Sequence, residues 1–147
     1  MTGYLLDTNV VSAFAPGRPA ASPQLAQWLE AHSDLLFLSV ISIVEVEAGI
    51  KKLQRTGGKG RADLLAAWIE QILAAYHERV LAFDLAAGRL AGALTDRARA
   101  AGSHPGFADI AIAATAQHHG LVLLTVNVRD FRAIGIRYAN PFEALPH

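Results

Sequence analysis

Short apolar runs alternate with longer segments of helical periodicity along this chain. Strands are predicted where apolar residues run together with few charges, at residues 3–6, 35–39, 79–83 and 121–126, with a last short strand within 135–141. Helices are predicted where apolar residues recur at spacings of three and four, over residues 8–15, 23–32, 42–55, 62–77, 85–102 and 107–120. Apolar strands separated by helices indicate an α/β fold with a mostly parallel sheet covered on both faces.

Length and composition point to one hydrophobic domain over residues 1–147. Hydrophobic residues make up 52% of the chain, charged residues 18%, and the mean hydropathy is +0.28. This apolar excess suggests that a partner or a second copy covers part of the surface. The stretch at 35–44 is too short to span a membrane. We therefore expect a soluble, cytoplasmic domain with no membrane partner.

Charge and cysteine usage exclude several classes of function. Lys and Arg together number 13, as do Asp and Glu, so a nucleic-acid partner would have to meet a local basic patch. The absence of cysteine rules out disulfides, zinc–thiolate sites and cysteine nucleophiles.

Polar residues follow the predicted strands at positions where ligands bind in parallel α/β folds. Asp7 comes directly after the first strand and is followed by Thr8 and Asn9. Asp7 also suits the N-cap of the next helix, and for Asp7 taken alone this capping role and a ligand-binding role have about equal weight. Thr125 lies at the end of the predicted strand 121–126, and Asn127 and Asp130 follow it. Ordinary turn chemistry is the alternative explanation for these three residues.

Two further acids lie on predicted helices. Glu45 closes the segment SIVE (42–45), which fits a capping box, yet it also follows an apolar strand. Its neighbour Glu47 points to nearly the opposite helix face. Asp109 lies in the first turn of an almost wholly apolar helix, where the helix dipole favours an acid. A buried helix would aim Asp109 into a crevice.

Convergence of these carboxylates at one sheet edge would require a cation, because the charges repel one another. Oxygen ligands without cysteine favour Mg²⁺ or Mn²⁺. Such ions suit phosphoryl chemistry, since they activate water and neutralise charge on the phosphate.

Four segments resemble the PIN-domain family, and within it the VapC-type toxins of type II toxin–antitoxin pairs, including the FitB-like branch. They are LLDTNVVSAF near the start, LSVISIVEVEAGIKKL in the first third, ADIAIAATAQHHGLVLLTVNVRDF late in the chain, and the closing NPFE. The resemblance extends from about residue 4 to residue 143. It implies a three-layer α/β/α domain and a metal-dependent ribonuclease acting on RNA phosphodiesters.

The resemblance also assigns roles to individual residues. The family's acids fall on Asp7, Glu45 and Asp109, and its fourth acidic position falls on Asn127. Asp7 and Asp109 would hold Mg²⁺ or Mn²⁺, with Glu45 bound directly or through water. Thr8, Asn9 and Thr125 would support the site, and either Asn127 or Asp130 would complete it. The motif reads TVN at 125–127, with Val126 where an arginine is frequent.

Partners are predicted from the basic segment 51–61 and from the family. RNA contacts are expected from the cations in that segment. Cations are also favourable at a helix C-terminus, and this structural explanation has about equal weight. The candidate RNA-binding residues are Lys51, Lys52, Arg55, Lys59 and Arg61. The family implies a homodimer and a VapB-like antitoxin. His118 and His119 do not share a helix face and suit a helix end better than a metal site. The helix 62–77 could form an interface or ordinary core.

Two other functions remain open at this stage. A haloacid-dehalogenase-type phosphatase would need an aspartate where Asn9 stands, which argues against it. A non-catalytic binding domain would use the same acids as structural caps and act through association with protein or nucleic acid.

Overall fold

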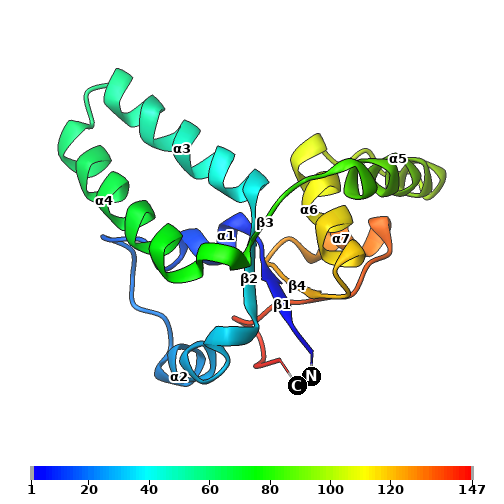
Figure 1. Ribbon diagram of the computed structural model, residues 1–147, viewed down its shortest axis with the longest axis horizontal. Coiled ribbons are helices and arrows are strands. Elements are labelled where there is room, and N and C mark those ends of the chain that lie inside the picture. Colours follow the sequence, from blue (N-terminus) through cyan, green and yellow to red (C-terminus); the bar gives the residue numbers. More distant parts are fainter. Residues whose placement is uncertain (1, 147) are drawn as a thin grey trace.

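All five predicted strands form one parallel sheet in the computed structural model, which describes residues 2–146 (Figure 1). The strands are β1 (Tyr4–Leu6), β2 (Leu36–Ser39), β3 (Val80–Leu81), β4 (Val122–Leu124) and β5 (Tyr138–Ala139), in the spatial order β3-β2-β1-β4-β5. The central strand β1 pairs with β2 on one side and β4 on the other, so that Leu5 lies between Phe37 and Leu123. The carboxyl ends of β1, β2 and β4 therefore meet at one edge.

Helices cover both faces of this sheet. They are α1 (Thr8–Ser12), α2 (Pro23–Ala31), α3 (Val40–Arg55), α4 (Lys59–Tyr76), α5 (Leu85–Ala100), α6 (Phe107–His118) and α7 (Val128–Ile134), with short 3-10 turns η1 (Ser33–Leu35) and η2 (His77–Arg79). Helices α3 and α4 pack together as an antiparallel hairpin on one side of the molecule, while α5, α6 and α7 pack together on the other (Figure 1). The three-layer α/β/α prediction is confirmed.

Alternation of side chains along β1 divides the core into two parts. Leu5 points to the side of α5, α6 and α7, where it packs with buried residues such as Ile112 and Phe131. Tyr4 and Leu6 point to the opposite side and pack in a cluster with Leu38, Ile50, Trp68 and Ile69. Because successive strand residues face opposite sides, a strand covered on both faces must be apolar throughout. This requirement explains the uninterrupted run YLL.

The helix 62–77 of the prediction is part of the core. It is observed as α4, which begins at Lys59, and its Trp68 and Ile69 are 8% and 1% exposed. Ile72 and Leu73 are half-buried against the same cluster. Of the two open interpretations of this helix, ordinary core is the one that the packing supports.

The capping-box interpretation of SIVE is wrong. Helix α3 begins at Val40, and its N-cap is Ser39, whose hydroxyl accepts a hydrogen bond from the amide of Ile41 at 3.0 Å. Ser42 lies inside the helix and is buried. The helix begins earlier than predicted because β2 leads into it without a loop. Glu45 therefore does not cap this helix.

Helix α7 was not predicted, since no helix or strand was assigned to residues 127–134. It is short, and its buried side chains Phe131 and Ile134 are spaced by three residues on one face. Gly135 ends it in a left-handed conformation with φ +86°. A segment this short leaves too little periodicity to distinguish a helix from a turn.

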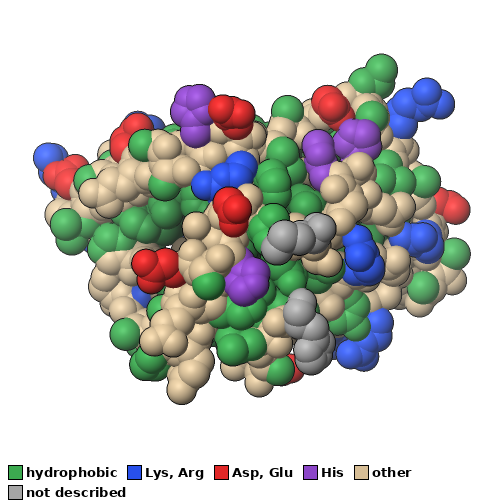
Figure 2. Space-filling view, turned by 60° about the horizontal axis from the view of Figure 1, so that its bottom comes forward, with side chains coloured by type: hydrophobic (Ala, Val, Ile, Leu, Met, Phe, Trp, Pro, Cys, Tyr) green, Lys and Arg blue, Asp and Glu red, His purple; other side chains and the backbone are tan. Residues whose placement is uncertain are grey.

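Lys and Arg side chains do not gather in one patch on the face shown in Figure 2. On the face shown in Figure 2, hydrophobic side chains are exposed in several places between scattered Lys and Arg side chains. Within residues 2–146, no helix is long and apolar enough to cross a membrane.

Candidate active site at the carboxyl edge of the sheet

Asp7 is fixed at the sheet edge by its backbone and by its position before α1. Its amide donates to the carbonyl of Leu124 in β4 at 2.9 Å, which extends the β1–β4 pairing by one residue. Its side chain is only 4% exposed, and Oδ1 accepts from the amide of Thr8 at 2.8 Å. Asp7 is therefore both the N-cap of α1 and a buried acid at the strand end.

The second oxygen of Asp7 is held by neutral donors. Oδ2 accepts from the Thr125 hydroxyl at 2.7 Å and from the Asn9 amide group at 3.2 Å. Burial raises the pKa of Asp7 above its usual value, although these hydrogen bonds oppose the increase. No Lys or Arg of residues 2–146 forms an ion pair with it, so the charge of this carboxylate is not neutralised by a side chain.

Glu45 reaches the same edge from α3. The Thr8 hydroxyl lies 2.6 Å from Glu45 Oε1 and 2.8 Å from Ser42 Oγ. A hydroxyl has one proton and a carboxylate only accepts, so Thr8 donates to Glu45 and Ser42 donates to Thr8. Glu45, rather than Glu47, thus faces the strand ends. Ser42 was missed as part of the site because its sequence context suggested a cap.

Asp109 enters from the first turn of α6 and is half-buried. Asn127 lies between two acids, with Nδ2 at 3.5 Å from Asp109 Oδ2 and 2.9 Å from Asp130 Oδ2. The Asn127 amide donates to Thr125 Oγ1 at 2.9 Å. Since Thr125 bonds Asp7, a continuous chain of polar contacts joins Asp7 to Asp109 and Asp130.

Electrostatic repulsion is evident at Asp109. Its pKa is raised to about 6, first by burial and then by the negative charges of Asp7, Asp130 and Glu45. An ordinary solvated aspartate has a pKa near 3.9. The acids therefore repel one another through a partly dry region, and no Lys or Arg in the described part of the chain forms an ion pair with them. We call these four residues the acidic array.

The donor set of the acidic array suits a hard cation, because every side-chain ligand it offers is an oxygen. In residues 2–146 as arranged, no group of three or more His, Asp or Glu side chains is close enough to hold one ion jointly. An ion of the Mg²⁺ type usually takes one or two carboxylates and keeps several waters, so it does not require three protein ligands.

The predicted basic segment divides into two parts. Lys51, Lys52 and Arg55 are exposed on the last turns of α3, and Lys59 pairs with Asp63 at 3.5 Å, both side chains being mostly exposed. Arg61 is different, since it lines a cavity of about 200 Å³ together with Thr8 and Glu45.

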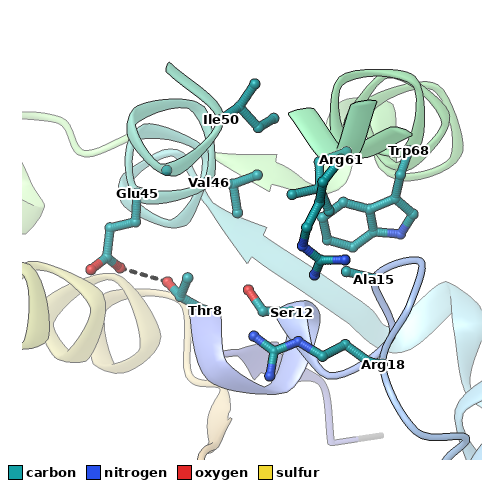
Figure 3. Close-up of a pocket in the computed structure, with 11 residues that line it drawn as sticks. Thr8, Ser12, Ala15, Arg18, Glu45, Val46, Ile50, Arg61 and Trp68 are labelled. Atoms are coloured by element: carbon teal, nitrogen blue, oxygen red, sulfur yellow. Dashed lines mark hydrogen bonds between the residues drawn. The ribbon is translucent and has the colours of Figure 1, made fainter. Parts of the chain in front are cut away.

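A second arginine, Arg18, lines the same cavity (Figure 3). It lies in the loop after α1, where no site residue was predicted from the sequence. His118 and His119 contact each other at the end of α6, and neither makes a contact with the acidic array. Val126 is 45% exposed and carries no charge to the site.

Comparison with known proteins identifies the family. The PIN-domain profile matches residues 4–136. The chain is 34% identical to plasmid stability protein StbB of Pseudomonas syringae pv. tomato over 95% of this chain and 99% of that one. It is also 34% identical to VapC ribonuclease Y4jK of Sinorhizobium fredii, over 95% of this chain and 97% of that one.

The fold agrees with the same assignment. The crystal structure of FitAcB from Neisseria gonorrhoeae superposes with a TM-score of 0.81 at 30% identity, covering 96% of this chain and 99% of that chain. The chain therefore belongs to the PIN-domain family, in the group that contains the VapC and FitB toxins.

Proposed function

We propose that this protein is a divalent-cation-dependent endoribonuclease that hydrolyses RNA phosphodiester bonds. The observation that carries the proposal is the acidic array, in which buried Asp7, half-buried Asp109 and Asp130 and exposed Glu45 are held by neutral donors at the carboxyl edge of a parallel sheet. The similarity to a protein named VapC ribonuclease over nearly the whole chain supports RNA as the substrate class.

Mg²⁺, or Mn²⁺ in its place, would be held by Asp7 and Asp109, with Glu45 reached directly or through water. The chemistry supplied by such an ion is activation of water for attack on phosphorus and neutralisation of charge on the phosphate. Thr125 and Asn9 keep Asp7 oriented through hydrogen bonds to Oδ2. Such outer contacts fix the direction in which a ligand oxygen points.

The remaining polar residues act on orientation and proton transfer. Thr8 donates to one oxygen of Glu45, which leaves the other oxygen free to orient the attacking water and accept its proton. Asn127 donates to both Asp109 and Asp130, so it fixes the spacing between them. In this arrangement Asn127 is a positioning residue, and Asp130 supplies the fourth carboxylate.

We further propose that the chain, a single domain, is the toxin of a type II toxin–antitoxin pair and acts in the cytoplasm. The similarity to toxin FitB, at 31% identity over 95% of this chain, supports this role. A VapB-like antitoxin and a second copy of the chain would be its protein partners. Exposed apolar side chains suit coverage by a protein, and the largest exposures are 79% at Leu85, 68% at Phe107 and 60% at Leu64.

The test is cleavage of a mixed RNA pool by the purified protein with Mg²⁺, beside EDTA and an Asp109→Asn variant. Asp96→Asn is the matched control, since Asp96 is exposed on α5 away from the array. Cleavage by the wild type and by Asp96→Asn that disappears in EDTA and in Asp109→Asn would support the proposal. Undiminished cleavage by Asp109→Asn would contradict the site. Absence of cleavage by the folded wild type on every RNA class would favour a non-catalytic binding domain.

A further inference from the structure

A cavity adjoins the acidic array between α1, the loop that follows it, α3 and α4. Thr8 and Glu45, which belong to the site already described, form one side of this cavity (Figure 3). Arg18 and Arg61 lie on the other side, with Ser12 between, and both guanidinium groups point into the space (Figure 3). The cavity therefore has a negative end and a positive end.

The two arginines lack compensating acids. Within residues 2–146, neither guanidinium lies within 4.0 Å of a carboxylate, and the ion pair observed there is Lys59–Asp63. Two like charges directed into one cavity repel each other, so the cavity favours an anion. The planar donor fork of arginine matches phosphate oxygens in particular.

The loop after α1 is shaped around the guanidinium of Arg61. Its Nη1 donates to the carbonyl of Pro16 at 3.2 Å. Gly17 has φ +83°, and a Cβ at this position would lie 2.7 Å from Arg61 Nη1. Glycine therefore serves two needs at once, the left-handed backbone and the close approach of the guanidinium. The guanidinium of Arg61 thus packs directly against the backbone of this loop.

We infer that this cavity binds a phosphate of the RNA strand next to the phosphate that is cleaved, with Arg18 and Arg61 as its ligands. The inference rests on the proposed function. An RNA strand with its scissile phosphate at the acidic array must pass its neighbouring phosphates along the adjoining surface, and Glu45 and Thr8 are common to both. Trp68, at 8% exposed, is too buried to stack on a base, so the contact is with the backbone and independent of sequence.

The first experiment measures binding of a short fluorescein-labelled single-stranded RNA by the full chain in EDTA, where cleavage does not interfere. Arg18→Gln and Arg61→Gln should each weaken binding on the order of tenfold, as expected for a charge-assisted hydrogen bond. In the double variant, the slope of log K against log salt concentration should become less steep by about 0.7, the value for one phosphate contact on a single strand. Arg99→Gln, an equal loss of charge at an exposed position on α5, should bind as the wild type does.

A second pair of variants leaves the charge unchanged. Gly17→Ala should displace Arg61 and weaken RNA binding, because its Cβ meets the guanidinium. Gly102→Ala is the matched control, since Gly102 has φ +80° and nothing within 4 Å of the added Cβ. Both variants carry the same backbone strain, and their folding is checked by thermal unfolding. Equal RNA affinity of the two variants would contradict the inference.

The outcomes separate this inference from the proposed nuclease activity. Cleavage by the wild type in Mg²⁺ together with unchanged RNA affinity in the double arginine variant would overturn the phosphate site alone. Absence of RNA binding by the wild type in EDTA would also overturn it, whatever the cleavage result. Binding of a hexaglutamate peptide is a further arm. Peptide binding that depends on the two arginines, with RNA binding that does not, would assign the cavity to a protein partner instead.

Discussion

The acidic array adjoins one end of the cavity through Glu45, the arginine pair lines the other end, and the two are built in opposite ways. Asp7 is buried and held by neutral donors from Thr8, Asn9 and Thr125. Arg61 is exposed and held by a backbone carbonyl. Neither end neutralises the other by an ion pair within residues 2–146. Hydrogen bonds to neutral groups orient a charge without cancelling it, so each end keeps its charge for a ligand.

The largest effect is expected at the acidic array. Asp7→Asn removes a carboxylate that would hold the cation, and cleavage in Mg²⁺ should fall by at least about 100-fold, in the range seen when one preorganised electrostatic contact is lost. RNA affinity in EDTA should not fall, because a negative charge has been removed near the RNA. Initial cleavage rates and anisotropy titrations measure the two quantities. A parallel loss of both would mean that the two ends of the cavity do not have separate roles.

A smaller effect is expected when an orienting contact is removed. Thr125→Val keeps the shape of the side chain but removes the hydroxyl that donates to Asp7 Oδ2 and accepts from the Asn127 amide. Loss of such an outer contact typically costs 10–100-fold in metal affinity or activity. The Mg²⁺ concentration at half-maximal cleavage should therefore increase. Thr95→Val is the control, because its hydroxyl bonds only the Ala91 carbonyl within α5. An unchanged Mg²⁺ requirement in Thr125→Val would contradict the role of Thr125.

The third effect is on stability and depends on pH. The pKa of Asp109 is raised from 3.8 to about 6 in the fold, so the protonated carboxyl is favoured by folding. Its stabilisation is complete below about pH 4 and is lost as the pH rises through about 6. In EDTA, Asp109→Asn should therefore unfold at a higher temperature than the wild type at pH 8, and at the same temperature near pH 4. Thermal unfolding across this pH range measures the difference.

Divalent cations sharpen this stability test. A cation that binds only the folded state must stabilise it, so Mg²⁺ or Mn²⁺ should raise the melting temperature of the wild type at pH 8. The same addition should have little effect near pH 4 or on Asp109→Asn. A higher wild-type melting temperature relative to Asp109→Asn in EDTA at pH 8 would mean that the acids do not repel one another.

The smallest effect is expected outside the cavity. Lys51→Gln removes a cation exposed on the last turns of α3, away from the side chains that line the cavity. Its RNA affinity in EDTA should change by less than about threefold, because an exposed charge in water interacts weakly. A loss as large as that of Arg61→Gln would extend the RNA site along the whole basic segment.

The sequence was sufficient to predict the sheet and the acids, because both depend on local pattern. Apolar runs such as YLL and VLL between helical segments predict strands covered on both faces, and a polar residue directly after such a strand lies at the sheet edge. Asp7 was found in this way. Asp109 and Glu45 were found as acids on largely apolar predicted helices, and the resemblance assigned roles to all three. The chain of contacts through Thr125 and Asn127 confirms that these segments meet, while their catalytic roles stay predictions.

Three features could not be predicted, and each depends on long-range contacts. Ser42 was interpreted as a cap, but the tight passage from β2 into α3 makes Ser39 the cap and leaves Ser42 to contact Thr8. Helix α7 is specified by the burial of Phe131 and Ile134 beneath it, not by its own periodicity. Arg18 lies 43 positions before Arg61 in a loop, and only the folded chain brings both to one cavity.

The central position of β1 also determines when this protein can become active during its synthesis. The first strand made pairs with β4, so the edge that carries Asp7 is not closed until residue 124 has left the ribosome. Asp109, Thr125 and Asn127 emerge in the same late portion of the chain. At about 5–20 residues per second, the nascent chain therefore lacks a complete site until the segment that carries Asp109, Thr125 and Asn127 has been synthesised. The ribosome is exposed to the assembled site only after that point in translation.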